Sequence, residues 1–283
     1  MTTFELLDSI SLPGHPEKPN DDAFASQPNA AVIMDGATGL GEPLMPGDSD
    51  AAWLARFGAR RLMAHIRDGD APLEAIRRAM EDSQQSFEAL RKRAPRETYE
   101  IPFASMMLIV ATEPGFEALW FGDCAALVRR PNEPVTVIGE AAEKRALEAE
   151  RVAKLAQRHG LSPAAGHNRP EYLEALRRAR NYANTEKGGW IFGPDPRVAD
   201  HVATQEAVAP TDSLVLLATD GFLALSSDYR RYDSETLIEA AADIGLAKLG
   251  AELREIEGTD LKGTRYPRFK TSDDATALLL RVA

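Results

Sequence analysis

Cysteine is nearly absent from this chain of 283 residues, in which Cys124 is the only one. A single cysteine excludes an internal disulfide and a cysteine metal cluster, and we expect a buried structural thiol. The five histidines form no cluster, so a zinc site of the histidine type is not expected. A reducing compartment fits this composition.

An excess of positive charge and a long apolar run are also missing. The net charge of -11 argues against nucleic-acid binding and against attraction to an anionic membrane. No apolar run approaches the ~20 residues that span a bilayer, and the N-terminus lacks the basic and apolar regions of a signal peptide. We therefore expect a soluble cytoplasmic protein, whose oligomeric state the sequence does not indicate.

The hydrophobic pattern predicts strands alternating with paired helices. Strands are expected at 4–10, 31–34, 103–111, 116–121, 125–128, 213–219 and 276–282. Helices are expected at about 49–68, 72–93, 140–159, 171–183, 233–244 and 247–256. The turn between 111 and 116 is so short that its two strands must pair antiparallel, which argues against a doubly wound parallel sheet.

One domain over residues 1–283 is expected, because the sequence has no internal repeat and no low-complexity linker. The span from about 139 to 197 has too little apolar content for its own core, so we interpret it as a helical flap inserted into that domain. Its cluster Arg177-Arg178-Arg180 is typical of a solvated helix face, and the alternative is a surface that attracts a phosphorylated partner.

Acidic residues recur where predicted strands end or are interrupted. The set is Asp21-Asp22, Asp35-Gly36, Gly122-Asp123, Asp220-Gly221 and Asp273-Asp274. Any single Asp-Gly pair is usually only a turn, so the repetition carries the argument. Carboxylates at neighbouring strand ends suit Mg²⁺ or Mn²⁺, and two such ions assist an in-line displacement at phosphorus.

The order of these short motifs resembles that of the PP2C family of metal-dependent protein serine/threonine phosphatases, as a divergent, bacterial-type member. The matching positions are Asn20-Asp21-Asp22-Ala23, Asp35-Gly36-x-x-Gly39, Ser105, Gly122-Asp123, Thr219-Asp220-Gly221 and Asp273-Asp274-x-Thr276. The resemblance implies an α+β fold, a four-layer α-β-β-α sandwich in which helix pairs flank two antiparallel sheets. It also implies that the insertion at about 139–197 corresponds to the variable flap of the family.

The same resemblance implies a dinuclear Mg²⁺ or Mn²⁺ centre with catalytic ligands at Asp35, Asp220 and Asp273. Asp35 resembles the carboxylate that bridges both metals, and the Gly36 carbonyl resembles a ligand of the second. Asp220 and Asp273 resemble the remaining ligands of the first metal. A water or hydroxide bound to this centre would attack phosphorus directly.

Further positions are implied around the two metals. Asp21 and Asp22 match the acidic pair that binds the metals' waters, and Asp123 matches a ligand of a weaker third metal. The arginine that holds the substrate phosphate in many relatives is replaced by Glu17 here, so Lys18 is the candidate for that contact.

Two other departures bear on the chemistry. Ala37 stands where eukaryotic relatives have a histidine proposed as general acid, so another group must protonate the leaving oxygen. Phe222, Leu223 and Ala224 supply no second acid after Asp220-Gly221, where relatives often have one that serves the third metal.

The sequence thus predicts a metal-dependent phosphomonoesterase, most simply a protein Ser/Thr phosphatase. Its partner would be a phosphorylated protein or a small phosphoester, not a nucleic acid or a membrane. A PP2C-like regulatory or binding protein with little or no catalysis, and a phosphatase of small metabolites, remain the alternatives.

Overall fold

Two five-stranded antiparallel sheets form the centre of the protein in a computed structural model that describes residues 2–139, 170–268 and 270–283. The first sheet has the strand order β1 (Phe4–Leu12), β10 (Ala275–Val282), β9 (Leu214–Ala218), β6 (Ala125–Arg129) and β7 (Thr136–Ile138). The second has the order β2 (Asp22–Gln27), β3 (Ala30–Gly36), β4 (Ala104–Thr112), β5 (Gly115–Phe121) and β8 (Ala203–Val208).

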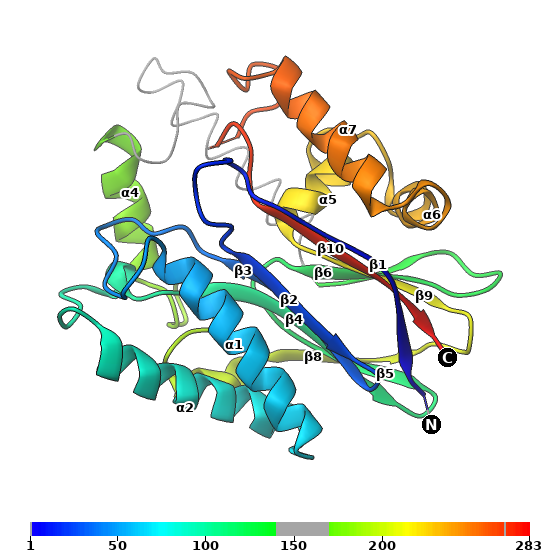
Figure 1. Cartoon of the computed structure of the whole chain (residues 1–283), viewed down its shortest axis with the longest axis horizontal. Helices are drawn as coiled ribbons and strands as arrows, with labels where there is room; N and C mark the ends of the chain where they lie inside the picture. Colours follow the sequence, from blue (N-terminus) through cyan, green and yellow to red (C-terminus); the bar gives the residue numbers. More distant parts are fainter. Residues whose placement is uncertain (1, 140–169, 269) are drawn as a thin grey trace.

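Helices cover the outer face of each sheet (Figure 1). Against the second sheet pack α1 (Asp50–Arg67) and α2 (Pro72–Leu90). Against the first pack α5 (Asp220–Ser227), α6 (Ser234–Ile244) and α7 (Leu246–Thr259). The other described helices are η1 (Thr98–Glu100), α4 (Pro170–Arg180) and η2 (Pro196–His201). The predicted four-layer α-β-β-α sandwich is confirmed.

Alternating side chains of the central strands explain why their sequences are apolar without interruption. Met34 of β3 packs toward α1 and α2, whereas its neighbour Ile33 packs between the two sheets. In β9, Leu216 faces the helices and Leu217 faces the other sheet. A strand covered on both faces buries every residue, and full burial of each such side chain contributes roughly 1.5–3 kcal/mol. Cys124 also lies buried between the sheets, as predicted.

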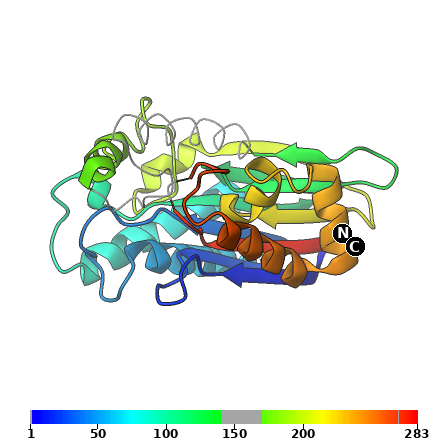
Figure 2. The same ribbon diagram turned by 90° about the horizontal axis from the view of Figure 1, so that it is seen from above.

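The two ends of the sandwich differ. The chain termini lie side by side at one end, where the backbones of Thr3 and Ala283 exchange hydrogen bonds (Figures 1 and 2). At the other end lie α4 and the loop that joins β3 to α1 (Figure 1). This loop begins after Gly36, and its residues Ala37, Thr38 and Leu40 line the same pocket as Asp35.

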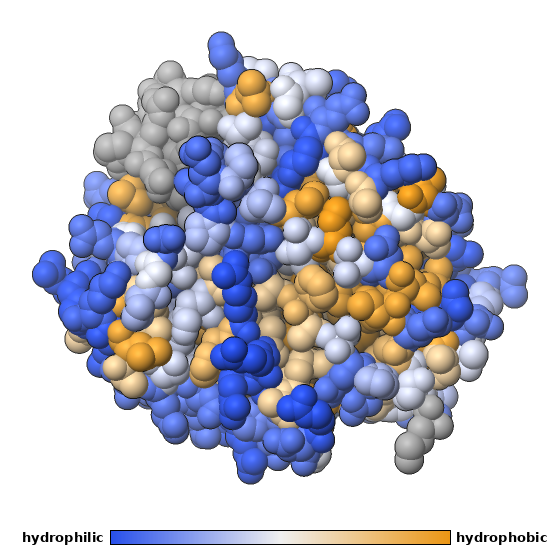
Figure 3. All heavy atoms as spheres, viewed as in Figure 1, coloured by the Kyte–Doolittle hydropathy of each residue, from blue (hydrophilic) through white to orange (hydrophobic). Residues whose placement is uncertain are grey.

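Figure 3 shows that apolar side chains gather to the right of the centre of this face, with hydrophilic residues around them. The edge strand β1 contributes Leu6, which is 42% exposed. None of the helices in the described ranges has the length and apolar character needed to cross a membrane.

Several elements differ from the sequence-based prediction. The strands β2, β7 and β8 were not predicted. β7 has only three residues, and β8 is an exposed edge strand with polar residues at three of its six positions. The helix α5 was also missed, since its start at Asp220-Gly221 looks like a turn. The predicted helix over residues 140–159 lies outside the described residues, and the single domain with its flap stays a prediction.

Candidate active site

The second sheet brings its acidic residues together through the register of three strands. Asp22 of β2 lies opposite Asp35 of β3, and Asp35 lies opposite Ser105 of β4. Directly opposed residues of antiparallel strands point to the same face. Side chains two residues apart in a strand point to the same face, and Ile33 packs between the two sheets. The side chain of Asp35 therefore also points to the face between the sheets. It therefore lies at the open end of the sandwich interior.

The first sheet supplies the opposing acids. Asp220 follows β9 as the first residue of α5, where the positive end of the helix dipole favours a carboxylate. Asp273 precedes the adjacent strand β10, and the Thr219 amide donates to the Thr276 carbonyl at 3.0 Å to hold the two strand ends together. A Cβ on Gly221 would lie 2.0 Å from the Asp274 carbonyl oxygen, so only glycine permits this close approach.

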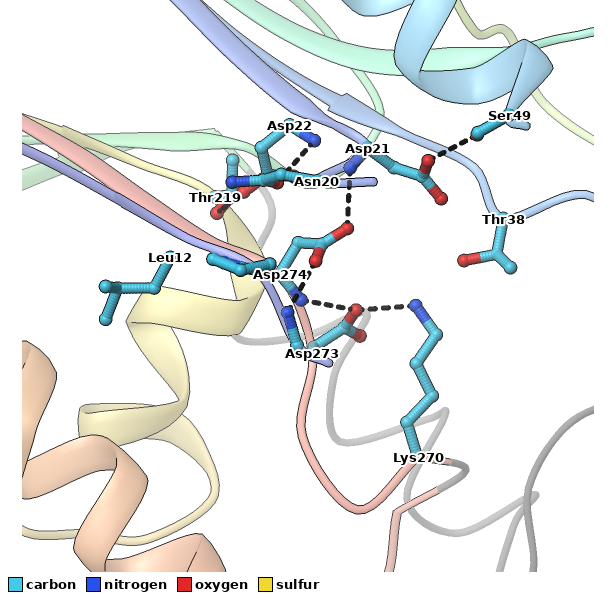
Figure 4. Close-up of polar contacts among 12 residues, drawn as sticks. Leu12, Asn20, Asp21, Asp22, Thr38, Ser49, Thr219, Lys270, Asp273 and Asp274 are labelled. Carbon is cyan, nitrogen blue, oxygen red and sulfur yellow. Dashed lines mark hydrogen bonds and ion pairs between the residues drawn. The ribbon is translucent and has the colours of Figure 1, made fainter. Parts of the chain in front are cut away.

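Hydrogen bonds join the two acidic groups across the sandwich (Figure 4). The Thr219 hydroxyl donates to Asp22 Oδ2 at 3.0 Å. Asp274 accepts from the backbone amides of Asp21 at 2.8 Å and Gly14 at 2.6 Å. Asp274 thus holds the loop between β1 and β2 against the loop before β10.

A pocket of about 280 Å³ opens at this end of the sandwich. Its acidic lining comprises Asp35, Asp123, Asp220, Asp228, Glu257 and Asp273. Asp123 accepts a hydrogen bond from the Ser105 hydroxyl at 2.6 Å. Gly122 lies against that serine at φ +78°, and a Cβ there would approach Ser105 Oγ to 2.2 Å. Gly122 therefore lets Asp123 reach the pocket beside Asp35.

The ionised forms of Asp35 and Asp22 are destabilised by burial and by the neighbouring acidic groups. Burial raises the pKa of Asp35 well above its ordinary value, and the charges of its acidic neighbours raise it further, Asp220 most among them. Burial and the charge of Asp274 likewise raise the pKa of Asp22. Asp22 Oδ1 is buried and has no hydrogen-bond partner within the described residues. Such a cluster is costly to keep ionised unless a cation compensates it.

One cation of the chain already lies in the cluster. Lys270 Nζ is 2.5 Å from Asp273 Oδ1 and points toward the acids in Figure 4. Burial alone would lower the pKa of Lys270, but the charge of Asp273 and, more weakly, those of Asp35 and Asp274 raise it above the ordinary value. Lys270 was not predicted as a site residue, although its spacing of three residues from Asp273 is a signal available in the sequence.

The basic residues lie differently from the predictions. Lys18 is exposed and lines a neighbouring pocket with Asp21 and Asp274, whereas the pocket of Asp35 contains Arg180, Lys270 and Arg268. The prediction of a solvated face holds only for Arg178, which is exposed and pairs with Glu174. Arg177 and Arg180 instead donate to backbone carbonyls of the loop after β3, because α4 lies against that loop.

The side chains that could bind a metal here offer anionic oxygen atoms, which hard divalent cations prefer as ligands. One of these oxygens, Asp22 Oδ1, is buried and has no hydrogen-bond partner among the described residues. Within residues 2–139, 170–268 and 270–283, no three His, Cys, Asp or Glu side chains form a ready-made ligand cluster. The acids share a pocket without closing on a common point, and Asp273 is held by Lys270. The metal roles of Asp35, Gly36, Asp220, Asp273 and Asp123 therefore stay predictions.

Comparisons with known proteins agree with this arrangement. The model of the family described as protein phosphatase 2C matches residues 15–254. Among solved structures, the catalytic domain of the serine threonine protein phosphatase PstP in complex with two manganese ions superposes with a TM-score of 0.56 at 15% identity, covering 100% of both chains.

Two further structures have the same fold. The serine/threonine phosphatase Stp1 from Staphylococcus aureus gives a TM-score of 0.53 at 15% identity, covering 99% of this chain and 95% of that one. RsbX in complex with magnesium gives 0.50 at 11% identity, covering 99% and 96%. No curated protein sequence matches this chain. Because the family model covers most of the sequence, this chain belongs to the protein phosphatase 2C family.

Proposed function

We propose that this protein is a Mg²⁺- or Mn²⁺-dependent protein Ser/Thr phosphatase whose centre holds two metal ions between the two sheets. The observation that carries the proposal is the convergence of Asp35, Asp220 and Asp273 on one pocket from both sheets. Membership of the protein phosphatase 2C family supports it independently. The manganese in PstP and the magnesium in RsbX support the choice of cation.

Asp35, the Gly36 carbonyl, Asp220 and Asp273 would hold the two metals, and Asp123 a weaker third. Bound Mg²⁺ or Mn²⁺ would neutralise phosphoryl charge and make a water more acidic. Asp21 and Asp22 lie beside these groups and would orient water by accepting its hydrogen bonds, a role for which the unpartnered Asp22 Oδ1 is suited.

The hydrolysis needs no covalent enzyme intermediate. Water oxygen forms a bond to phosphorus as the ester bond to the serine or threonine oxygen breaks, in line with the attack. Ala37, which lines the pocket, has no proton to give. We infer that the leaving oxygen takes its proton from water in the pocket.

The test uses the full chain loaded with Mn²⁺ and assayed on p-nitrophenyl phosphate and on a phosphothreonine peptide. Asp35→Asn should lower kcat/KM by at least about a hundredfold, since a carboxylate that positions metals is lost. Asp243→Asn makes the same chemical change at an exposed position of α6 and serves as the control.

The two alternatives are distinguishable outcomes of this assay. No turnover of either substrate by metal-loaded wild type would refute the enzyme and favour a binding or regulatory protein. Turnover of a panel of small phosphoesters with none of phosphopeptides would favour a metabolite phosphatase.

A further inference from the structure

Three cationic side chains of the described residues line the pocket of Asp35, and two of them are already paired. Lys270 is bound to Asp273 at 2.5 Å. Arg268 donates to Asp260 Oδ2 at 2.9 Å and also to the carbonyls of Asp260, Tyr266 and Thr271. Arg268 therefore has little hydrogen-bonding capacity left for a ligand.

Arg180, the last residue of α4, is different. Its Nη1 donates to the carbonyl oxygen of Thr38 at 2.5 Å, and no carboxylate pairs with it in the part of the chain that the structure describes. Burial lowers the pKa of Arg180 to about 10. Its side chain is half-buried, and a partly desolvated cation without an anionic partner is unfavourable in a folded protein. Its environment is therefore suited to an anion that arrives from solution.

The neighbouring arginines show that this placement is particular to Arg180. Arg178 is exposed and pairs with Glu174 one helical turn earlier. Arg177 donates to the carbonyl of Leu40 at 2.8 Å and stacks over the ring of Tyr99 at 4.9 Å. Only Arg180 of these three is both tied to the loop after β3 and part of the pocket lining.

The position of Arg180 suits a phosphate held at the acidic cluster. Thr38, its hydrogen-bond partner, lies three residues after Asp35, and both residues line the same pocket. A guanidinium has five N–H donors in a planar fork, so most of them remain for a second partner after one is used on a carbonyl. That fork matches two oxygens of a phosphoryl group.

We propose that Arg180 is the substrate-binding residue that contacts the phosphate oxygens of the phosphoester, so that this contact comes from α4 and not from the N-terminal loop with Glu17 and Lys18. This inference rests on the proposed function for the identity of the anion. It assigns the phosphate contact to Arg180 in the pocket of Asp35, whereas Lys18 is exposed and lines the neighbouring pocket, which shares Thr38, Lys270 and Asp273 with the first.

The experiment measures binding of inorganic phosphate, the product, to the Mn²⁺-loaded protein by calorimetry, and so does not depend on turnover. Arg180→Gln should raise the Kd for phosphate about 30-fold, as expected for a charged hydrogen-bonded contact, and Arg180→Lys should recover part of the loss. The Kd for Mn²⁺ alone should not change. If wild type is active, KM for a phosphopeptide should rise with the Kd for phosphate, and kcat should change less.

Arg177→Gln is the matched control, because it removes an arginine-to-carbonyl bond from the same helix to the same loop. An equal loss of phosphate binding in Arg177→Gln would show that loop anchoring is the cause and would overturn the proposal. Unchanged phosphate binding in Arg180→Gln, altered Mn²⁺ binding, or no phosphate binding by wild type would overturn it too. Loss of phosphate binding with an inactive wild type would support it while the proposed phosphatase activity failed.

Discussion

Replacing Asp35 with asparagine should make the metal-free protein more stable, although it should abolish function. The carboxylate of Asp35 is buried among like charges, and burial together with Asp220 and Asp22 raises its pKa. Asparagine has nearly the same shape and no charge. The substitution therefore removes a desolvation cost and a repulsion without opening a cavity.

We expect the free energy of unfolding to rise by about 0.5–2 kcal/mol, the range typical of a single stabilising substitution. An unfolding entropy of about 2.1 cal/mol/K per residue gives a chain of 283 residues about 0.6 kcal/mol/K. The melting temperature of the metal-free protein should then rise by about 1–3 °C.

The pH dependence has a definite sign. The ordinary pKa of an aspartate is 3.8, and the folded-state pKa of Asp35 is higher. Between these two values the folded state binds more protons than the unfolded state, so stability falls as pH rises from about 4 through the folded pKa. Asp22 contributes in the same direction. Asp35→Asn should therefore flatten the decline of stability with pH.

The assay is thermal unfolding of wild type, Asp35→Asn and the exposed control Asp243→Asn between pH 4 and 8, in chelator and in Mn²⁺. Mn²⁺ should stabilise wild type and the control by mass action, and Asp35→Asn much less. A lower melting temperature for metal-free Asp35→Asn, or an unchanged pH slope, would refute the idea that this carboxylate is electrostatically strained.

Two further predictions concern neighbours of the pocket. Lys270→Met removes the cation that competes for Asp273, so the Kd for Mn²⁺ measured by calorimetry should fall about three- to tenfold; weaker binding would mean that the lysine helps to form the site. Gly122→Ala places a Cβ 2.2 Å from Ser105 Oγ at a φ of +78°, so it should cost about 2–4 kcal/mol in denaturant unfolding; a cost under about 0.5 kcal/mol would contradict the close packing.

The sequence predicts best the features that depend on local pattern. Strands form within the predicted ranges 31–34 and 213–219 because residues 31–34 and 214–218 are apolar throughout, and burial on both faces requires that. The helix predicted at about 49–68 is α1, which Ser49 caps by accepting a hydrogen bond from the Ala52 amide at 3.1 Å. The acids at strand ends converge because antiparallel pairing brings those ends together.

Features set by contacts between distant segments were not predictable in the same way. The hydrophilic spacing of Arg177, Arg178 and Arg180 indicates a solvated face, yet two of these side chains turn to carbonyls about 140 residues earlier in the chain. Lys18 lies close in sequence to Asp21 but in another pocket from Asp35. Only the folded arrangement of α4 and the loop after β3 places Arg180 in the pocket of Asp35.

The most direct test of the central claim is anomalous diffraction from a crystal soaked in Mn²⁺. The account predicts manganese between the carboxylates of Asp35 and Asp220, with Asp273 released from Lys270 and turned toward the metal. Manganese bound only elsewhere, or a soaked crystal in which Lys270 still pairs with Asp273 and the pocket holds no metal, would contradict it.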